Sequence, residues 1–524
     1  MFRQLLNRNF YPWMGKKSLY TAVKANLDGN GKLQNEALPD DEEFWEGEPV
    51  RWVSGGLDGA LGHHASPDEN QAAAAELVDL LAMQSHHPSR NIRRKLYLLL
   101  MKEDVLSMID EVLESLRKKE DVDPSNLYEE AYWFASKGAH RNPVKFGIAL
   151  LGLFQTDDHL ELIMTLGKHD EFTLFSATAI QNSSSGNEKL FELAKSVDGW
   201  GKIHLVERLS PNTQEIKDWL LLEGYKNDIM HEYLAYTCAV NGELHKAIAS
   251  KDLDPALYEG AGGILSALIS GGPAEDIDDY EHAPFVTGEY LRHSERLCHT
   301  LEHLAVILDL HQFLSDEEGW MDRHSNQWSN GEQKRQLQIC ERIMNQAHWE
   351  ALIWLAVKAP DSSGRQHGYY AARMLGVDLW EELFSQLQTS PLDEGLYFEL
   401  MKTDNQDRVQ VLAAFAEAHL PLDEIAAGPQ EEMGLGEELQ AHSCLDFILQ
   451  ELDRFEGTGH KLISAGLNSA VVRNRNMALN ALEEWPVSSW NPQLMDDVKK
   501  LYEIEPDPSL KERFGSLIEA KNLA

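Results

Sequence analysis

The chain has 524 residues, and its 86 acidic against 47 basic residues give a formal net charge of -39 at neutral pH. A surface this acidic repels phosphate backbones and anionic lipids, which argues against nucleic acid and membrane surfaces as partners and favours a basic protein or peptide. The hydrophobic share of 43% is ordinary for a folded protein, so wholesale disorder is excluded as well.

Residues 1–70 are predicted to form a small irregular N-terminal region that caps a helical fold. The segment from Tyr20 to Leu27, a turn, and the pair Lys32–Leu33 indicate one hairpin. The basic start of the chain has no apolar core with a cleavage site, and no run of about 18 apolar residues occurs anywhere. With four scattered cysteines and no C-x-x-C, these features favour a cytoplasmic protein with reduced thiols.

The turn of this hairpin also resembles the beginning of an EF-hand calcium loop. Asn26, Asp28 and Asn30 occupy its first, third and fifth positions, and Gly31 occupies the sixth. The twelfth position, where an EF-hand has a bidentate glutamate, is Ala37. A glycine-containing hairpin turn is therefore favoured, with a calcium site at Asn26–Gly31 as the open alternative.

Residues 71–270 carry apolar positions that recur every 28 residues, a spacing typical of paired short helices. In an α-solenoid each helix pair buries its apolar stripe only against its neighbours, so this step predicts stacked helix pairs. We expect the recurring side chains to lie in one continuous core: Leu162, Phe172, Phe175, Leu190, Phe191, Trp200 and Ile203.

Three further segments follow in chain order. Residues 271–285 combine glycine, proline and acidic residues without an apolar stripe, which predicts a linker. Residues 286–425 contain two long predicted helices, from Leu291 to Leu314 and from Gln333 to Val357. Residues 426–524 form a C-terminal group, in which Val472, Ala478 and Leu482 share the inward face of one predicted helix.

The helix-pair patterns over roughly residues 70–270 and 400–524 resemble a HEAT-type α-solenoid, most clearly in the segment VVRNRNMALNALEEWP that begins at Val471. The resemblance implies an all-α fold, namely a curved solenoid of stacked helix pairs beside the small irregular N-terminal region. We expect a partner protein or peptide to bind on the concave face of such a solenoid.

The segment GWGKIHLVERL, from Gly199 to Leu209, resembles a group of bacterial proteins that carry the name limonene hydroxylase. This resemblance implies terpene hydroxylation, with onward oxidation of the alcohol by NAD. A hydroxylase needs an oxygen-activating cofactor. The sequence has no cysteine in a haem-binding loop and no Glu-x-x-His pair, and its best glycine-rich match has Leu265 in place of the last glycine. No cofactor is predicted, and no catalytic residue follows from the resemblance.

The strongest metal pattern in the sequence is His299-Thr300-Leu301-Glu302-His303. This is the H-x-x-E-H order of inverted zinc peptidases, in which two histidines on one helix face bind zinc and the glutamate activates water. His299 and His303 would then be the ligands and Glu302 the base. Among 21 histidines the pattern arises readily by chance, and no third ligand can be assigned, so ordinary helix residues are favoured.

Two functions of different classes follow from these observations. The favoured hypothesis is a non-catalytic interaction protein that holds a partner protein or peptide, and the net charge suggests a basic one. The alternative is an enzyme, either a terpene hydroxylase or a zinc hydrolase that uses the His299 pattern. Polar residues that converge in an enclosed pocket would favour the enzyme, whereas a broad open groove would favour the interaction protein.

Overall fold

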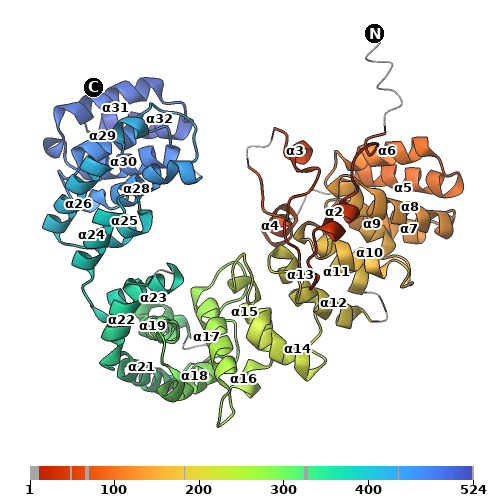
Figure 1. Cartoon of the computed structure of the whole chain (residues 1–524), viewed down its shortest axis with the longest axis horizontal. Helices are drawn as coiled ribbons and strands as arrows, with labels where there is room; N and C mark the ends of the chain where they lie inside the picture. Colours follow the sequence, from red (N-terminus) through yellow and green to blue (C-terminus); the bar gives the residue numbers. More distant parts are fainter. Residues whose placement is uncertain are drawn as a thin grey trace. The chain divides into compact units, whose positions relative to one another are not determined.

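The computed structural model describes residues 11–47, 50–64, 70–181, 183, 185–323, 328–359, 362–434 and 436–521. These residues form helices joined by turns, and their β pairing is limited to two isolated bridges, Leu27 with Leu33 and Glu432 with Val471. The predicted all-α fold class is therefore confirmed. The chain divides into two compact units, residues 1–347 and 348–524 (Figure 1). The finer division into five segments remains a prediction.

The first unit is built almost entirely from short helices. They are α2 (Leu19–Ala25), α3 (Asp41–Phe44), α4 (Gly56–His64), α5 (Gln71–His86), α6 (Arg90–Leu100), α7 (Ile109–Lys118), α8 (Pro124–Lys137), α9 (Arg141–Leu151), α10 (Leu160–Leu166), α11 (Asp170–Gln181), α12 (Gly186–Ala194), α13 (Trp200–Arg208), α14 (Gln214–Trp219), α15 (Glu232–Asn241), α16 (Leu244–Ala247), α17 (Pro255–Ser270), α18 (Ala283–Leu297), α19 (Leu301–Ser315), α20 (Glu317–Arg323) and α21 (Asn330–Met344).

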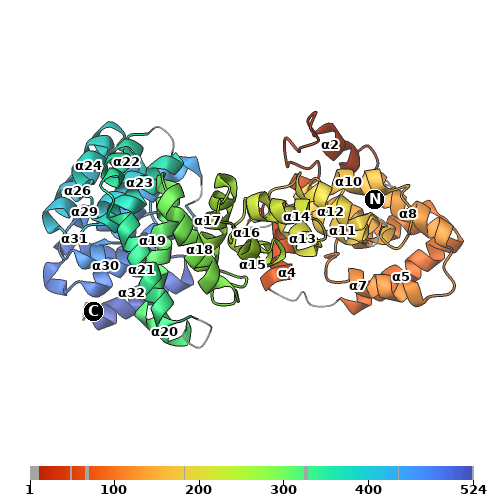
Figure 2. The ribbon, with the colours of Figure 1, turned by 90° about the horizontal axis from the view of Figure 1, so that it is seen from below.

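Alternate helices of this unit form a ladder. Each of α9, α11, α13, α15, α17, α19 and α21 packs against the next, while α10 and α12 pack beside α11 and α13 (Figures 1 and 2). The seven side chains predicted for the core from the 28-residue step are all buried. The 28-residue step thus predicted which of these side chains are buried, whereas the repeat organisation and its assignment to a HEAT-type repeat remain predictions.

The structure corrects the expected strand near the N-terminus, because Leu19–Ala25 is the helix α2. The Ser18 side chain accepts a hydrogen bond from the backbone of Thr21 and caps this helix. Leu19 and Val23, one helical turn apart, are both buried, so the apolar residues serve a helix face and not a strand. The expected hairpin is reduced to the single bridge between Leu27 and Leu33.

Both long helices predicted between residues 286 and 425 are interrupted. The first ends at Leu297, and α19 begins at Leu301 after the side chain of Thr300 caps it by accepting a hydrogen bond from His303. The second ends at Met344, and the next helix begins at His348. The apolar positions continue with helical spacing across both breaks, so the sequence pattern alone predicts uninterrupted helices.

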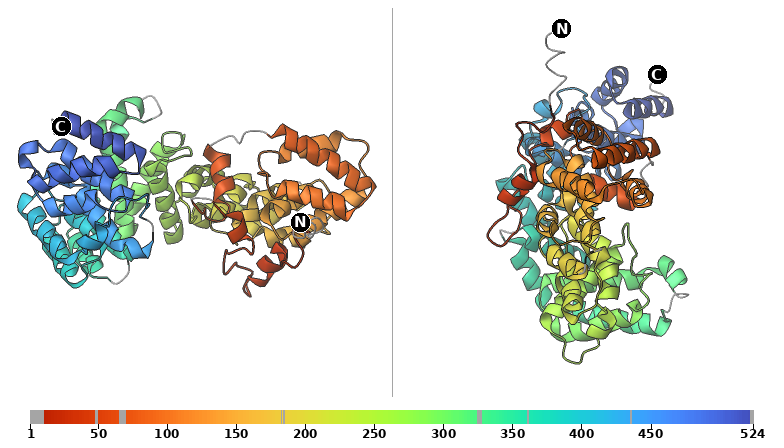
Figure 3. Two further views of the ribbon diagram at one scale, coloured as in Figure 1. Left: turned by 90° about the horizontal axis from the view of Figure 1, so that it is seen from above. Right: turned by 90° about the vertical axis from the view of Figure 1, so that its right-hand side faces the viewer.

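The second unit is also helical, and its C-terminal helices stack as one group, drawn in blue in Figure 3. Ala478 and Leu482 are buried as predicted, whereas Val472 is only partly covered. No helix among the described residues of either unit is long and apolar enough to cross a membrane. The helices are α22 (His348–Val357), α23 (Ser362–Leu375), α24 (Trp380–Thr389), α25 (Glu394–Met401), α26 (Gln406–His419), α27 (Leu422–Ile425), α28 (Gln440–Leu449), α29 (His460–Leu467), α30 (Val472–Glu484), α31 (Pro492–Ile504) and α32 (Pro508–Ala520).

Candidate functional site beneath the N-terminal segment

Residues 36–47 and 50–63, here called the N-terminal segment, lie against helices α9, α11 and α13 of the ladder. The Nε2 of His169 donates to the carbonyl of Glu36 at 2.9 Å, and the backbone amide of Arg141 donates to Asp40 at 2.8 Å. Further along, the amide of Gly55 donates to Glu171 at 3.3 Å. The segment therefore runs along the helices, and Figure 1 shows its helix α4 close to α13.

Two glycines allow the segment to approach the ladder this closely. Gly55 has a φ of 70°, and a Cβ there would lie 2.7 Å from the carbonyl oxygen of Asp170. At Gly59, a Cβ would lie 2.2 Å from the indole ring of Trp200. A side chain at either position would push the segment away from α11 and α13.

The contact between the segment and the ladder contains a buried charged centre. Lys145 of α9 places its Nζ 2.6 Å from Asp58 and 2.6 Å from Glu171. One turn earlier, the guanidinium of Arg141 faces Asp40 at 3.4 Å and Glu171 at 3.4 Å. All five side chains are buried, so each charge depends on its partners and not on water.

Burial is the largest influence on the pKa of Asp58, Glu171 and Lys145. It raises the pKa of Asp58 further than Lys145 lowers it. Burial also acts to raise the pKa of Glu171, but Lys145 and Arg141 together lower it. Burial acts to lower the pKa of Lys145, yet Asp58 and Glu171 outweigh that effect and raise it. Lys145 therefore stays cationic, and Glu171 anionic, at neutral pH.

A pocket of about 420 Å³ opens beside this centre, and we call it the Trp52 pocket. Its carboxylates come from the N-terminal segment and from the connection between α6 and α7, and its aromatic rings come from the N-terminal segment. The carboxylates are Asp40, Glu43, Asp58, Glu103 and Asp104, and the rings are Phe44, Trp45 and Trp52. Lys102, Lys145 and His140 also line it. The polar residues therefore converge on one pocket, which is predominantly acidic and aromatic.

A second pocket, of about 390 Å³, contains Asp170 at the first turn of α11. The Asp170 carboxylate accepts a hydrogen bond from the backbone of Gly201, and a Cβ at Gly199 would lie 2.1 Å from it. The carboxylate thus lies at the N-terminus of α13, where helix dipoles favour negative charge. Burial nevertheless raises its pKa to about 7, with smaller contributions from Glu36, Asp198 and Asp228.

Replacing Asp170 with asparagine should change how stability depends on pH. The pKa of Asp170 is about 7 in the folded state, against an ordinary value of 3.8. Between these two pH values the folded state therefore holds a proton that the unfolded state has released. Wild-type stability should therefore fall as the pH rises from about 4 to about 7, by up to about 1.4 kcal/mol per pH unit from this group.

The measurement is the unfolding free energy of both proteins across this pH range. The difference between the wild-type and Asp170→Asn proteins should shrink, or reverse in favour of the variant, as the pH rises. Asp198→Asn, which removes a more exposed carboxylate from the same pocket, controls for the general loss of negative charge. Parallel profiles for the wild-type and Asp170→Asn proteins would contradict the assignment.

Within the described residues, one group of three side chains could hold a metal ion: His63, His204 and Glu207. His63 ends the N-terminal segment, and the other two lie on α13. Burial, then the nearby Arg208 and His63, lower the pKa of His204 to about 3, so this imidazole is neutral at physiological pH.

The structure separates the residues of the H-x-x-E-H pattern. His299 lies outside any helix, between α18 and α19, so it does not share a helix face with His303 as predicted. Its backbone amide donates to the ring of His303 at 3.4 Å, and His303 also faces Glu259 at 3.9 Å. His299 and Glu302 are exposed, and no three-ligand group among the described residues includes either histidine.

The turn at Asn26–Gly31 is held together by its own hydrogen bonds. The Asp28 carboxylate accepts from the backbone amides of Asn30 and Lys32, at 2.8 Å and 2.9 Å. The side chain of Asn26 donates to the carbonyl of Asn35. Two of the three candidate calcium ligands therefore make hydrogen bonds within the turn, and a calcium site at Asn26–Gly31 stays the open alternative.

Sequence reasoning missed both the charged centre and the His63 group. One signal was present, because Lys145 stands between the core residues Val144 and Phe146 on a helix whose other residues after Asn142 are all apolar. His204 and Glu207 lie three residues apart in the segment GWGKIHLVERL, and this spacing is the signal that the sequence offers for the His63 group. Their partners lie on the N-terminal segment, and nothing in the sequence indicates that it folds back over α9, α11 and α13.

No family model and no curated protein matches the chain. Among solved structures, a crystal structure of an engineered protein is similar at 12% identity, over 86% of this chain and 99% of that chain, with a TM-score of 0.24. A likeness at that level carries no argument about fold or function. Function must therefore be inferred from the residues of the site.

Proposed function

We propose that the protein is a non-catalytic interaction protein that binds a basic segment of a partner protein or peptide, with the Trp52 pocket as the binding site. The observation that carries this proposal is the composition of the pocket, in which five carboxylates and three aromatic rings surround about 420 Å³. Neither enzyme alternative is carried forward, because His299 and His303 do not share a helix face and the hydroxylase resemblance supplies no catalytic residue.

Charge supports a cationic ligand. One of the two lysines in the pocket, Lys145, makes ion pairs with Asp58 and Glu171. Glu43 makes an ion pair with Lys16, which lies outside the pocket lining. Glu103 accepts a hydrogen bond from the side chain of Asn70, and Asp104 accepts one from the backbone amide of Leu106. Among the described residues neither of these two carboxylates, which line the side formed by the α6–α7 connection, makes an ion pair. An arginine or lysine side chain that enters would meet carboxylates and the faces of aromatic rings, both of which attract cations.

Exposed apolar side chains adjoin the pocket. Trp52 is 46% exposed and Val53 is 61% exposed, and both follow the acidic stretch around Glu46 in the N-terminal segment. Large apolar residues are rarely left in water without a reason when they gather beside a pocket, and tryptophan is a frequent anchor of protein interfaces. This surface therefore offers both a pocket for a charge and an apolar contact for its neighbours.

The test is fluorescence anisotropy with a labelled peptide that alternates arginine and leucine, against an equally long peptide in which glutamate replaces arginine. We expect the full-length protein to bind the basic peptide, with an affinity that falls as salt is added. Trp52→Ala and Glu103→Gln should each weaken binding about tenfold or more. Leu355→Ala, which removes a 71% exposed leucine from the other unit, should not.

Each outcome decides the proposal. Circular dichroism verifies that the variants are folded, so a lost signal is attributable to the pocket. Equal binding of the basic and acidic peptides, or binding that survives both pocket substitutions, would show that the Trp52 pocket is not the binding site.

A further inference from the structure

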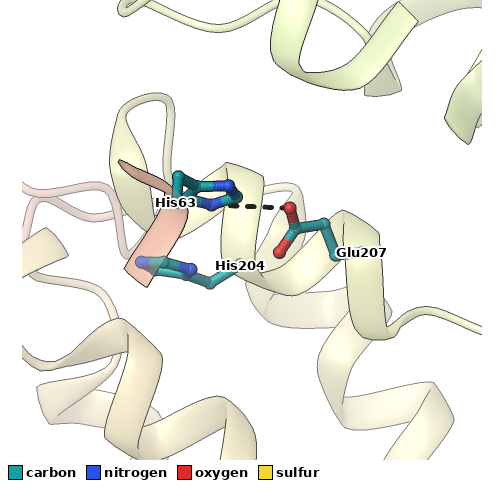
Figure 4. A group of neighbouring side chains, drawn as sticks. All are labelled: His63, His204 and Glu207. Carbon is teal, nitrogen blue, oxygen red and sulfur yellow. Dashed lines mark ion pairs between the residues drawn. The ribbon is translucent and has the colours of Figure 1, made fainter. Parts of the chain in front are cut away.

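His63, His204 and Glu207 form a compact group where α4 meets α13. Their ligand atoms all lie within 4.8 Å of one another, and the Nε2 of His63 lies 3.5 Å from an oxygen of Glu207 (Figure 4). His204 and Glu207 are three residues apart on α13, which places them on one face of the helix. His63 reaches them from the last turn of α4.

We infer that this group is a binding site for one divalent transition-metal ion, of the zinc or ferrous iron class. Two imidazoles and one carboxylate are the ligand set that both ions accept in proteins, and three protein ligands leave a coordination position open. The inference is independent of the proposed function, since none of the three residues lines the Trp52 pocket.

The distances suit an ion after a small adjustment. With metal–ligand bonds of about 2.0–2.2 Å, the ligand atoms of a tetrahedral site lie about 3.3–3.6 Å apart. The His63–Glu207 pair is already at 3.5 Å, and the remaining pairs, none beyond 4.8 Å, need to close by no more than about 1.5 Å.

The surroundings hold the ligands in place and leave access for the ion. The ring of His63 stacks on that of His204, with centroids 5.9 Å apart, and packs beside Trp200 and Tyr233. While one oxygen of Glu207 faces His63, the other lies 3.6 Å from Arg208, which orients the carboxylate. The side chains of His63 and Glu207 are 23% and 32% exposed, so an ion can reach them from solvent, whereas His204 is buried.

The buried Nε2 of His204 makes no hydrogen bond with the described residues. No partner at that atom therefore dictates which ring nitrogen carries the proton, so the ring can offer a lone pair to an ion. A bound ion would also join the N-terminal segment to α13, two elements far apart in the sequence. Metal binding should thus make α4 harder to detach from the ladder.

The experiment titrates the full-length, chelator-treated protein with Co²⁺, whose visible absorption reports coordination by nitrogen and oxygen. Competition with Zn²⁺, and with Fe²⁺ in the absence of oxygen, then ranks the two physiological ions. We expect one equivalent to bind, and His63→Ala, His204→Ala and Glu207→Gln each to weaken binding about 100-fold or more. His299→Ala, on the exposed H-x-x-E-H pattern, should leave the affinity unchanged.

Two readouts keep the test decisive. Glu207→Gln preserves the size of its side chain, so it answers the question even if His204→Ala unfolds. Hydrogen exchange of α4 should slow when the metal is added to the wild-type protein and not to Glu207→Gln. Failure to bind one equivalent tighter than millimolar, or undiminished binding by Glu207→Gln and His63→Ala, would overturn the inference. Trp52→Ala should bind the metal normally, which separates this result from a failure of the proposed function.

Discussion

Replacing Lys145 with methionine is expected to lower the free energy of unfolding of the first unit by about 3–5 kcal/mol. The ammonium group lies 2.6 Å from both Asp58 and Glu171, and all three side chains are buried. Methionine has a similar length but no charge, so the variant strands the buried Asp58 carboxylate and leaves Glu171 with Arg141 as its remaining cation. Breaking one side of a buried ion pair is costly for this reason, even where the intact pair contributes little.

The matched control for this variant is Lys189→Met on α12. Lys189 makes an ion pair with Glu192 at 2.8 Å on the surface, and such pairs contribute at most about 1 kcal/mol. Equilibrium unfolding, followed by tryptophan fluorescence and by hydrogen exchange of α9 and α11, measures both variants. The loss in Lys145→Met should diminish as the pH falls toward about 4, because burial raises the pKa of the stranded Asp58 carboxyl, which then takes up a proton. Losses of equal size in the two variants would contradict the buried-centre interpretation.

The helical ladder could be predicted because its cause is local. Apolar residues that recur with the pitch of a helix must face a neighbouring helix, so Phe172, Trp200 and Ile203 are buried as their spacing indicates. Short elements were less predictable. The residues of α2 suit a strand or a helix equally well by composition, and the capping hydrogen bond of Ser18 decides in favour of the helix.

The candidate site could not be predicted because its groups come from distant parts of the chain. Asp40 and Arg141 are 101 residues apart, yet they share a hydrogen bond. Helical periodicity carries no information about such a pairing, since it describes only which face of one helix is apolar. In the H-x-x-E-H pattern, by contrast, closeness in sequence does not bring the side chains onto one helix face. Its residues are close in sequence, but the end of α18 at Leu297 separates His299 from the helix that carries His303.

Among the described residues of the second unit, one ion pair is fully buried, between Arg475 of α30 and Glu505 at the end of α31. The guanidinium donates to both carboxylate oxygens of Glu505, from Nε at 2.9 Å and from a terminal nitrogen at 2.7 Å. Its remaining donors bind the backbone carbonyls of Ser469, Ala470 and Gln430. All five N–H groups of the arginine therefore have an acceptor, and its side chain is 0% exposed.

Arg475→Met should destabilise the second unit by about 3–5 kcal/mol or more, because it strands the Glu505 carboxylate and leaves three carbonyls without a donor. Arg475→Lys should be intermediate, since lysine keeps the charge but has three donors and no planar fork. Arg454→Met, which removes a half-exposed arginine paired with Asp404 and Glu451, is the matched control and should cost less than about 1 kcal/mol. Denaturant unfolding of the full-length proteins, with hydrogen exchange of α30 and α31 to assign the transition, gives the three values. A loss in Arg475→Met no larger than that in Arg454→Met would show that the pair is not the bond that joins these helices, because neither the stranded charge nor the unbound carbonyls would then carry a cost.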